Sequence, residues 1–162
     1  MLTPFNLKFC GKYGIIIEGT NIVIVGKWRN IMEQSLVLIK PDAVERNIIG
    51  EIIHQYERNG LKISRMQLMN ATEKIARKHY EELEDKPFFE DLITYITRGP
   101  LVALVIEGEN AIEAIRAING VTNPEEAAPN TIRALYGNDV TENSVHASDS
   151  PESAEREIAI WF

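Results

Sequence analysis

Leu101-Val102-Ala103-Leu104-Val105-Ile106 is an unbroken run of apolar residues. A strand with one wet face alternates apolar and polar residues, whereas a run without alternation is typical of a strand that is covered on both faces. The run therefore predicts the central strand of a sheet, and the other segments can be assigned around it.

Three further segments have the character of strands. Ser35–Ile39 alternates in polarity and stops before Pro41, which cannot continue a strand. Leu61–Asn70 also alternates, but its phase changes near Arg65, which indicates a β-bulge. Ser144–His146 is short and would supply a last strand.

Apolar residues at helical spacing separate these strands. Ile49, Ile52, Ile53 and Tyr56 lie at i, i+3, i+4 and i+7, and Asn59-Gly60 would close this amphipathic helix. Four more helices are predicted: one capped by Thr72 with a buried stripe that runs to Leu83, one over Phe88–Thr97, one with Ala111, Ile112, Ile115 and Ile118 that ends at Gly120, and one that begins at Ser150-Pro151.

Two helix starts and one loop complete this outline. Asp42 with Glu45, and Asn110 with Glu113, have the spacing of a capping box. Val121–Glu142 is polar and contains prolines, and a loop of this length inside a compact domain is usually functional. Strands and helices mixed in this order predict an α/β (α+β) sandwich, in which helices cover a mostly antiparallel sheet.

Length and composition narrow the class of protein. The 162 residues suffice for one ordinary domain, and the single cysteine, Cys10, excludes a disulfide framework. The net charge of −7 argues against broad binding to DNA, RNA or anionic lipid, which needs a positive surface. No apolar run approaches the ~20 residues of a membrane span, and no secretory signal is recognised, so we expect a cytoplasmic protein.

Residues 1–31 differ in character from residues 32–162. The first segment carries a net charge of +3 and the second a net charge of −10. Tyr13–Ile17 and Asn21–Val25 are β-like runs that could pair as a hairpin. Residues 1–31 are either a basic, β-rich appendage or an upstream extension assigned by mistake before a true start at Met32, and we favour the second interpretation.

Common phosphate-binding and metal-binding patterns are absent from the sequence. It contains neither GxxxxGK[ST] nor GxGxxG, and no pair of its histidines has the spacing of metal ligands. His79 lies on an apolar helix stripe and is interpreted as a core histidine. His54 lies beside an apolar stripe and is interpreted as a flank residue.

Of the three histidines, His146 is the candidate for a chemical role, because of the residues that surround it in the sequence. It stands at the end of a predicted strand and just before a predicted helix N-terminus, which attracts anions. A neutral imidazole is a nucleophile when one nitrogen is bare and the other donates to an orienting group, and Asp149, Glu152 and Glu157 are carboxylates within reach. The alternative is a turn histidine that is hydrogen-bonded to Ser148-Asp149-Ser150.

Lys40, Arg116 and Arg133 stand apart from runs of opposite charge. Each of them alone is more often a solvated surface charge. Together, in a segment with a net charge of −10, they are candidates for neutralising a polyphosphate.

The segment Asn143–Ser150 reads N-S-V-H-A-S-D-S. It resembles the signature N-x-x-H-x-S-D-S of the nucleoside diphosphate kinases. Further segments between about Glu33 and Phe162 resemble this family in the same order: Leu38–Asp42, His79-Tyr80, Lys86–Phe89, Arg116, Thr122–Pro124, Thr131–Arg133 and Glu152–Ile158.

The resemblance implies a ferredoxin-like sandwich with a four-stranded sheet. It also implies a ping-pong transfer of the γ-phosphate from a nucleoside triphosphate, mainly ATP, to a nucleoside or deoxynucleoside diphosphate. His146 would carry the phosphate as phosphohistidine, and Glu157 would fix its tautomer.

The family's other site residues are carried over by position. Lys40 and Tyr80 would lie by the transferring group and the ribose. The remaining contacts would be Arg116, Thr122 and Arg133 to the β- and γ-phosphates, Asn143 to the sugar and Phe88 to the base. Mg²⁺ would arrive on the nucleotide without dedicated protein ligands. The chain would form a homo-oligomer, either a tetramer or a hexamer.

Three positions depart from the family's pattern. Lys86 replaces a frequent arginine, Ala147 replaces a glycine, and Asn130 stands for a loop glycine whose left-handed conformation asparagine can adopt. None of them removes a catalytic group. Two other functions remain open: a nucleic-acid-binding regulator, which the negative charge opposes, and a nucleotide-binding scaffold without catalysis, which the complete set of site residues opposes.

Overall fold

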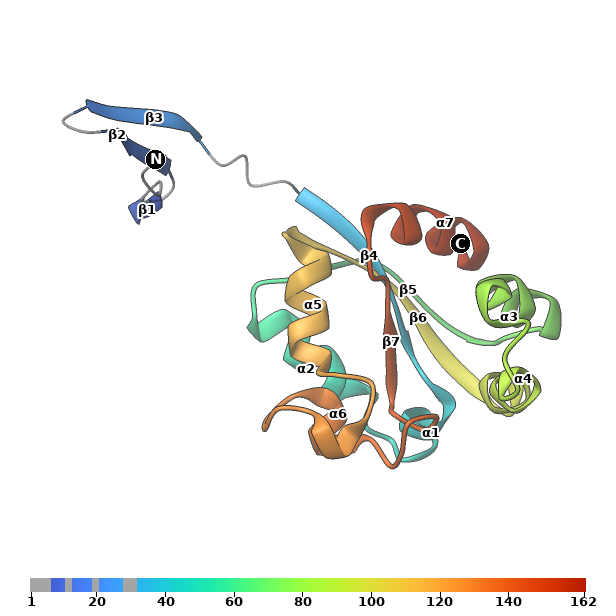
Figure 1. Cartoon of the computed structure of the whole chain (residues 1–162). Helices are drawn as coiled ribbons and strands as arrows, with labels where there is room; N and C mark the ends of the chain where they lie inside the picture. Colours follow the sequence, from blue (N-terminus) through green and yellow to red (C-terminus); the bar gives the residue numbers. More distant parts are fainter. Residues whose placement is uncertain (1–6, 11–12, 19–20, 28–31) are drawn as a thin grey trace. The chain divides into compact units, whose positions relative to one another are not determined.

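The computed structural model describes residues 7–10, 13–18, 21–27 and 32–162 (Figure 1). The chain divides into two compact units, Met1–Ile31 and Met32–Phe162, and this boundary coincides with the change in net charge. In the first unit, β1 (Leu7–Cys10), β2 (Tyr13–Glu18) and β3 (Asn21–Lys27) form an antiparallel sheet in sequence order. The predicted pairing of the two β-like runs is confirmed.

The second unit is built on a four-stranded sheet. Its strands are β4 (Met32–Ile39), β5 (Lys62–Asn70), β6 (Pro100–Glu109) and β7 (Val145–Ala147), in the order β5-β6-β4-β7. Every pair is antiparallel. The predicted central strand is therefore confirmed, since β6 has a partner on each side. The predicted bulge is also confirmed by a register shift between Ile63 and Arg65.

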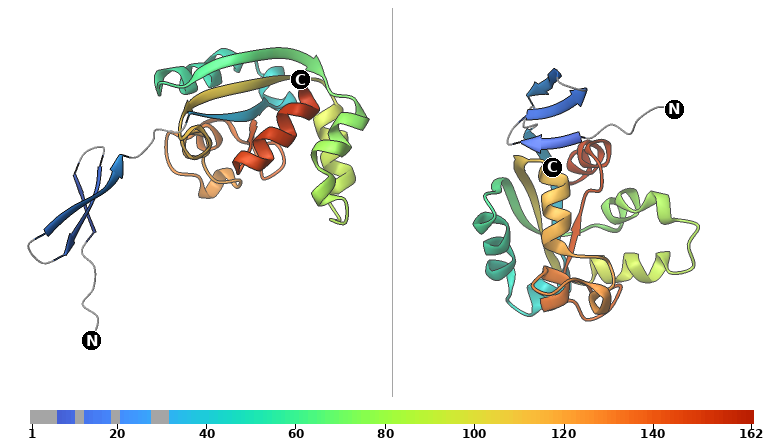
Figure 2. Two further views of the ribbon diagram at one scale, coloured as in Figure 1. Left: turned by 90° about the horizontal axis from the view of Figure 1, so that it is seen from above. Right: turned by 60° about the vertical axis from the view of Figure 1, so that its left-hand side comes forward.

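Helices cover both faces of this sheet. Their bounds are α1 (Pro41–Glu45), α2 (Ile49–Arg58), α3 (Glu73–His79), α4 (Phe89–Thr97), α5 (Ala111–Asn119), α6 (Ile132–Tyr136) and α7 (Pro151–Trp161), with short 3₁₀ helices η1 (Glu81–Leu83) and η2 (Pro124–Glu126). Helices α2 and α5 lie on one face, and α3, α4 and α7 lie on the other (Figures 1 and 2). Among the described residues, none of the helices has the length and apolarity needed to cross a membrane.

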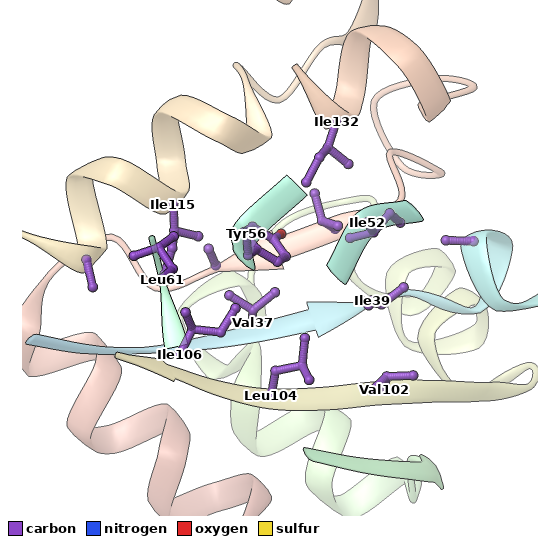
Figure 3. Packing of buried hydrophobic residues seen from close by; sticks show 14 residues of the cluster. Val37, Ile39, Ile52, Tyr56, Leu61, Val102, Leu104, Ile106, Ile115 and Ile132 are labelled. Atoms are coloured by element: carbon purple, nitrogen blue, oxygen red, sulfur yellow. The ribbon is translucent and has the colours of Figure 1, made fainter. Parts of the chain in front are cut away.

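The alternation of β4 and β6 explains why two cores form. Val37 and Ile39 of β4 face α2 and α5, where Ile52, Tyr56 and Ile115 pack on them (Figure 3). The intervening residues of β4 face the other way and pack in a second cluster with α3, α4 and α7, which contains Leu36, Leu38, Ala76, Ile93, Ile96 and Trp161. A stretch of strand that is covered on both faces is apolar throughout, as Leu101–Ile106 within β6 is.

Two helix caps agree with the sequence and two do not. The hydroxyls of Thr72 and Ser150 accept hydrogen bonds from Ile75 N and Ser153 N, as expected. The capping box predicted at Asp42 is wrong, because α1 has no side-chain cap and this carboxylate is buried.

The capping box predicted at Asn110 and Glu113 is also wrong. Asn110 is in the left-handed region, with φ of 50°, so its side chain forms no cap. Glu33 of β4 accepts the hydrogen bond from Ile112 N instead. The hydrogen bond from Ile112 N to Glu33 joins residues far apart in the sequence, and a local capping pattern cannot reveal such a pair.

Two helix boundaries also differ from the predictions. Helix α3 ends at His79, and Leu83 belongs to the separate turn η1, so the predicted stripe is interrupted at Tyr80. The predicted loop Val121–Glu142 contains η2 and α6. The predicted left-handed conformation of Asn130 is confirmed by its φ of 68°.

Candidate active site

His146 lies on β7, directly opposite Leu38 of β4. Its side chain is 23% exposed at the wall of a cavity of about 870 Å³. The structure brings all of the predicted site residues to this cavity: Lys40, Tyr80, Phe88, Arg116, Thr122, Arg133, Asn143, His146 and Glu157. They come from segments that are distant in sequence, so the fold gathers them.

Glu157 of α7 holds one nitrogen of His146. The Nε2 atom of His146 lies 3.3 Å from Glu157 Oε1 and 3.2 Å from Oε2. An ionised carboxylate only accepts hydrogen bonds, so Nε2 of a neutral His146 carries the hydrogen and Nδ1 is bare. This is the arrangement that a histidine nucleophile needs.

Ser148 fixes the carboxylate in turn. Its hydroxyl donates to Glu157 Oε2 at 2.6 Å and accepts from Leu36 N at 3.1 Å. Of the other two candidate carboxylates, Glu152 is exposed, and Asp149 lines the cavity with a pKa lowered mainly by a hydrogen bond from Ser153. Of the three candidate carboxylates, Glu157 is therefore the one that contacts the His146 ring.

Lys40 is a buried cation at the end of β4. Its Nζ donates to Asn143 Oδ1 at 2.8 Å and to Thr141 O at 3.4 Å. Burial, followed by the charge of Arg133, lowers the pKa of Lys40 to about 7. A bound anion would stabilise the charged form of Lys40, because it would offset both the burial of the ammonium and its repulsion by Arg133.

Arg133 and Arg116 supply further positive charge. Arg133 donates to Gly120 O at 2.7 Å and to Val145 O at 2.9 Å, and its buried Nε has no hydrogen-bond partner among the described residues. Burial lowers the pKa of this guanidinium, and the neighbouring charge of Arg116 lowers it further. Arg116 is exposed and lines the same cavity. The cavity therefore favours an anionic ligand.

Asn143 organises the wall around Lys40. Besides accepting from Lys40, its amide donates to Thr122 O at 3.0 Å and to Val140 O at 2.8 Å. The side chain is buried, and its hydrogen bonds tie the loop of Thr122 to the start of β7. A contact of Asn143 with a sugar stays a prediction.

Apolar and aromatic groups form the remaining wall. Phe88, Val121 and Val140 line the cavity and are each about half exposed, with relative exposures of 50%, 54% and 55%. Exposed apolar surface at a cavity mouth suits the face of a planar base. Tyr80 lies deeper, where burial and the charge of Glu157 raise its hydroxyl pKa above the usual value.

Sequence reasoning missed the placement of two residues. The sequence indicates Ser148 in the family motif and as an alternative turn contact of His146, whereas in the structure its hydroxyl donates to Glu157. His79 was predicted to be a core residue, and it is indeed buried. However, it also borders the cavity, and its ring meets the His146 ring edge to face, with centroids 4.5 Å apart.

Comparisons with known proteins agree on one family. The family model described as nucleoside diphosphate kinase matches residues 33–162. A nucleoside diphosphate kinase of Clostridium perfringens is 61% identical over 131 residues, which are 81% of this chain and 92% of that protein. The enzyme of Archaeoglobus fulgidus is 53% identical over 131 residues, which are 81% and 87% of the two chains.

Solved structures give the same result. The nucleoside diphosphate kinase of Aquifex aeolicus superposes with a TM-score of 0.80 at 41% identity, covering 82% of this chain and 96% of that one. The Halobacterium salinarum enzyme, solved with CDP, superposes with a TM-score of 0.79 at 44% identity, covering 82% and 88%. These neighbours have the ferredoxin-like α/β fold, so the predicted fold is confirmed.

Proposed function

Because the chain belongs to the nucleoside diphosphate kinase family, we propose that His146 is the residue that carries the phosphoryl group. The chain is a nucleotide phosphotransferase, and its family moves the γ-phosphate from a nucleoside triphosphate to a nucleoside diphosphate by a ping-pong reaction. The observation that carries the assignment is the contact of His146 Nε2 with both oxygens of Glu157, at 3.2 and 3.3 Å, beside a cavity that gathers cations.

The first half-reaction uses the bare nitrogen of His146. Nδ1 attacks the γ-phosphorus, an N–P bond forms, and the bond to the bridging oxygen breaks with its electron pair on the departing diphosphate. No proton has to leave His146, because Nδ1 is bare and Nε2 keeps its hydrogen for Glu157. A second diphosphate then enters the same cavity and reverses these steps.

The cations of the cavity hold the phosphates in this proposal. Lys40, Arg116 and Arg133 neutralise the β- and γ-phosphates, and Thr122 adds a hydroxyl donor at the cavity wall. Such charges stabilise the equatorial oxygens, where negative charge develops in the transition state.

Three residues place the nucleoside. The exposed ring of Phe88 stacks on the base without reading its hydrogen-bonding edge, which supports tolerance of different bases. Tyr80 and Asn143 contact the transferring group and the ribose. We propose that the protein accepts nucleoside diphosphates with different bases, because stacking on Phe88 is the main contact to the base.

The nucleotide enters with a divalent metal, as in this family, and we propose that the metal is Mg²⁺. The carboxylates of Asp149 and Glu82 line the cavity, and hard oxygen donors of this kind suit Mg²⁺ and its water ligands. When bound with the nucleotide, the metal would shield the negative charge of the phosphates, and no dedicated protein ligand is proposed for it.

Assembly and location complete the proposal. Strand β5 lies at an edge of the sheet, and its Met66 and Leu68 are 60% and 61% exposed. Exposed apolar residues on an edge strand favour coverage by another chain, which supports a homo-oligomer of four or six copies. Light scattering of the purified protein measures that number. We place the protein in the cytoplasm, with its nucleotides, and propose residues 32–162 as the kinase domain.

A pulse-chase experiment tests the role of His146. The protein is mixed with γ-labelled ATP and Mg²⁺, and unlabelled GDP is then added. We expect acid-labile label on the wild-type chain, its release as GTP, and no label on His146→Ala. His54→Ala is the matched control, because His54 is exposed on α2 outside the cavity. Label on the His146→Ala chain comparable to wild type would refute the assignment.

A further inference from the structure

His79 is a buried titratable group that the proposed mechanism does not use. It is 4% exposed, and its Nε2 has no hydrogen-bond partner among the described residues. One nitrogen of His79, one nitrogen of His146 and one oxygen of Glu157 lie within 4.8 Å of one another. An orphaned polar atom at such a place costs stability and needs an explanation.

Trp161 determines which nitrogen of His79 carries the hydrogen. Its indole Nε1 lies 3.2 Å from His79 Nδ1. An indole N–H can only donate, so Nδ1 of His79 must be the bare, accepting nitrogen. The hydrogen of a neutral His79 is therefore on Nε2.

The surroundings also keep His79 neutral. Burial holds the pKa of His79 well below its usual range, and the neighbouring His146, Arg156 and Lys40 lower it further. Protonation would put a hydrogen on Nδ1 as well, where it would face the N–H of Trp161. His79 thus has one accessible state, with a single hydrogen at Nε2.

This state matters because two adjacent imidazoles can hydrogen-bond to each other. The two rings meet edge to face with centroids 4.5 Å apart, so in our account a bare Nε2 of His79 would be an acceptor for the N–H of His146 in competition with Glu157. His146 would then be free to turn, or to move its hydrogen to Nδ1, and the nucleophilic lone pair would be lost.

We propose that Trp161 and His79 form a tautomer lock for the nucleophile: Trp161 keeps His79 as a neutral Nε2–H donor, so that Glu157 is the sole acceptor for His146. This inference rests on the proposed role of His146. Both residues are positioning residues, since they act through His146. The missing partner of His79 Nε2 is explained by the same lock, because an acceptor at that place would compete for His146.

The lock also argues against a metal site at these residues. Among the described residues, His79, His146 and Glu157 form a group that could surround a metal ion. A metal would need a bare nitrogen on each histidine, whereas Trp161 takes the lone pair of His79 Nδ1 and leaves a hydrogen on Nε2. The group is therefore arranged to hold hydrogens and not a cation.

Long-range ¹⁵N–¹H correlation spectra of the full chain with ¹⁵N-labelled histidine test the tautomer directly. We expect His79 to show a protonated Nε2 and a bare Nδ1 near pH 7. A hydrogen on Nδ1, or a charged His79, would overturn the proposal. This measurement needs no variant, so it decides the matter even if a substituted chain fails to fold.

Three variants test the consequence for catalysis. Trp161→Phe keeps an aromatic ring and removes the donor, so we expect the rate constant of phosphorylation at saturating ATP to fall about fivefold, the factor that one ordinary hydrogen bond is worth. The nucleotide Kd should stay the same. Phe162→Leu, at the same end of the chain and packed in the same core, is the control and should leave the rate unchanged.

The combination of Trp161→Phe with His79→Phe is decisive. Without an imidazole at residue 79 no competing acceptor exists, so the double variant should be faster than Trp161→Phe alone. A double variant that is equally slow or slower, a Trp161→Phe chain at the wild-type rate, or an equal loss in Phe162→Leu would overturn the lock. Failure of the His146→Ala pulse-chase test would instead overturn the proposed function, so the two failures are distinguishable.

Discussion

The two halves of the cavity are built in opposite ways. In the half around the nucleophile, His146, Glu157 and Ser148 satisfy one another through hydrogen bonds of 2.6 to 3.3 Å. In the half proposed to bind the phosphates, Lys40 is buried and Arg133 is half-buried, and neither has an ion-pair partner among the described residues. The hydrogen bonds of the first half are complete without a ligand, whereas in the proposal an anion completes the second half.

This contrast indicates which property of the protein each half of the cavity determines. Elsewhere in the described chain, Arg46, Arg77 and Arg98 pair with carboxylates, and Arg58 and Arg65, which pair with no carboxylate side chain among the described residues, are exposed. Burial without an ion-pair partner is therefore characteristic of the cavity. Unpaired buried cations weaken the free protein and bind the nucleotide more tightly. Changes in the nucleophile half should therefore alter the reaction rate, and changes in the phosphate half should alter affinity and stability.

The largest effect is expected for Glu157→Gln. Loss of the carboxylate charge and of its fixed acceptor role should slow phosphorylation of His146 by roughly 100-fold. The nucleotide Kd should change little, because Glu157 does not face the phosphates in this account. Rapid-quench kinetics and equilibrium binding separate the two quantities. A large change in the nucleotide Kd with an unchanged rate of phosphorylation would contradict the assignment of reaction rate to this half of the cavity.

Arg133→Met should show the opposite pattern. We expect the Kd for ATP to rise about 30-fold, as for the loss of a charge-assisted hydrogen bond. The free protein should be no less stable to urea, since a half-buried charge without an ion-pair partner is removed, although Gly120 O and Val145 O lose a donor. Titration calorimetry and urea unfolding measure both. Weaker folding together with unchanged affinity would contradict the account.

Lys40 should make nucleotide binding dependent on pH. Its pKa in the free protein is lowered to about 7, so the fraction of charged Lys40 falls above that pH. We expect the affinity for ATP to fall by at most about tenfold for each unit of pH through this range, and Lys40→Met to have a weaker but flatter profile. Equal slopes in the two proteins would remove Lys40 as the cause.

The lowered pKa of Lys40 also predicts how the free energy of unfolding depends on pH. The unfolded chain keeps the proton of Lys40 up to its ordinary pKa of 10.5, whereas the folded chain releases it near 7. Between these values the unfolded state binds more protons, so the free energy of unfolding should rise with pH, by at most about 1.4 kcal/mol per unit. Lys40→Met should lose this slope, and urea unfolding at a series of pH values measures it.

The smallest effect is expected from deleting residues 1–31. Residues 32–162 form a compact unit that contains every residue of the cavity wall. Both halves of the cavity should therefore survive, with kcat and Kd within about twofold of those of the full chain, the scatter expected when independent sites are changed. Steady-state kinetics of the shortened chain test this. Loss of folding would show that the first unit is required.

The sequence predicted what depends on local spacing. The core strand at Leu101–Ile106, the caps at Thr72 and Ser150, and the pairing of His146 with a carboxylate on the next helix all join residues close in the chain. The isolation of Lys40, Arg116 and Arg133 in an acidic segment marked the cations, and the family resemblance added Tyr80, Phe88, Thr122 and Asn143. These seven residues line one cavity with His146 and Glu157.

What could not be predicted depends on residues that meet only in the fold. Trp161 donates to His79 across 82 positions, and Lys40 donates to Asn143 across 103. The side chain of Asn110 does not form the predicted cap, and Glu33 of a distant strand accepts the hydrogen bond from Ile112 N. Spacing along the chain carries no signal for such pairs, which require the register of the sheet and the packing of α7.

The central claim is that Glu157 holds Nε2 of His146 and leaves Nδ1 to react. Its most direct test is the position of the phosphate on the chain after reaction with ATP and Mg²⁺, read from ³¹P and ¹⁵N spectra with labelled histidine. The account predicts one phosphoryl group, bonded to Nδ1 of His146, while Nε2 keeps its hydrogen. A phosphoryl group on Nε2 of His146, on another residue, or on none would contradict it.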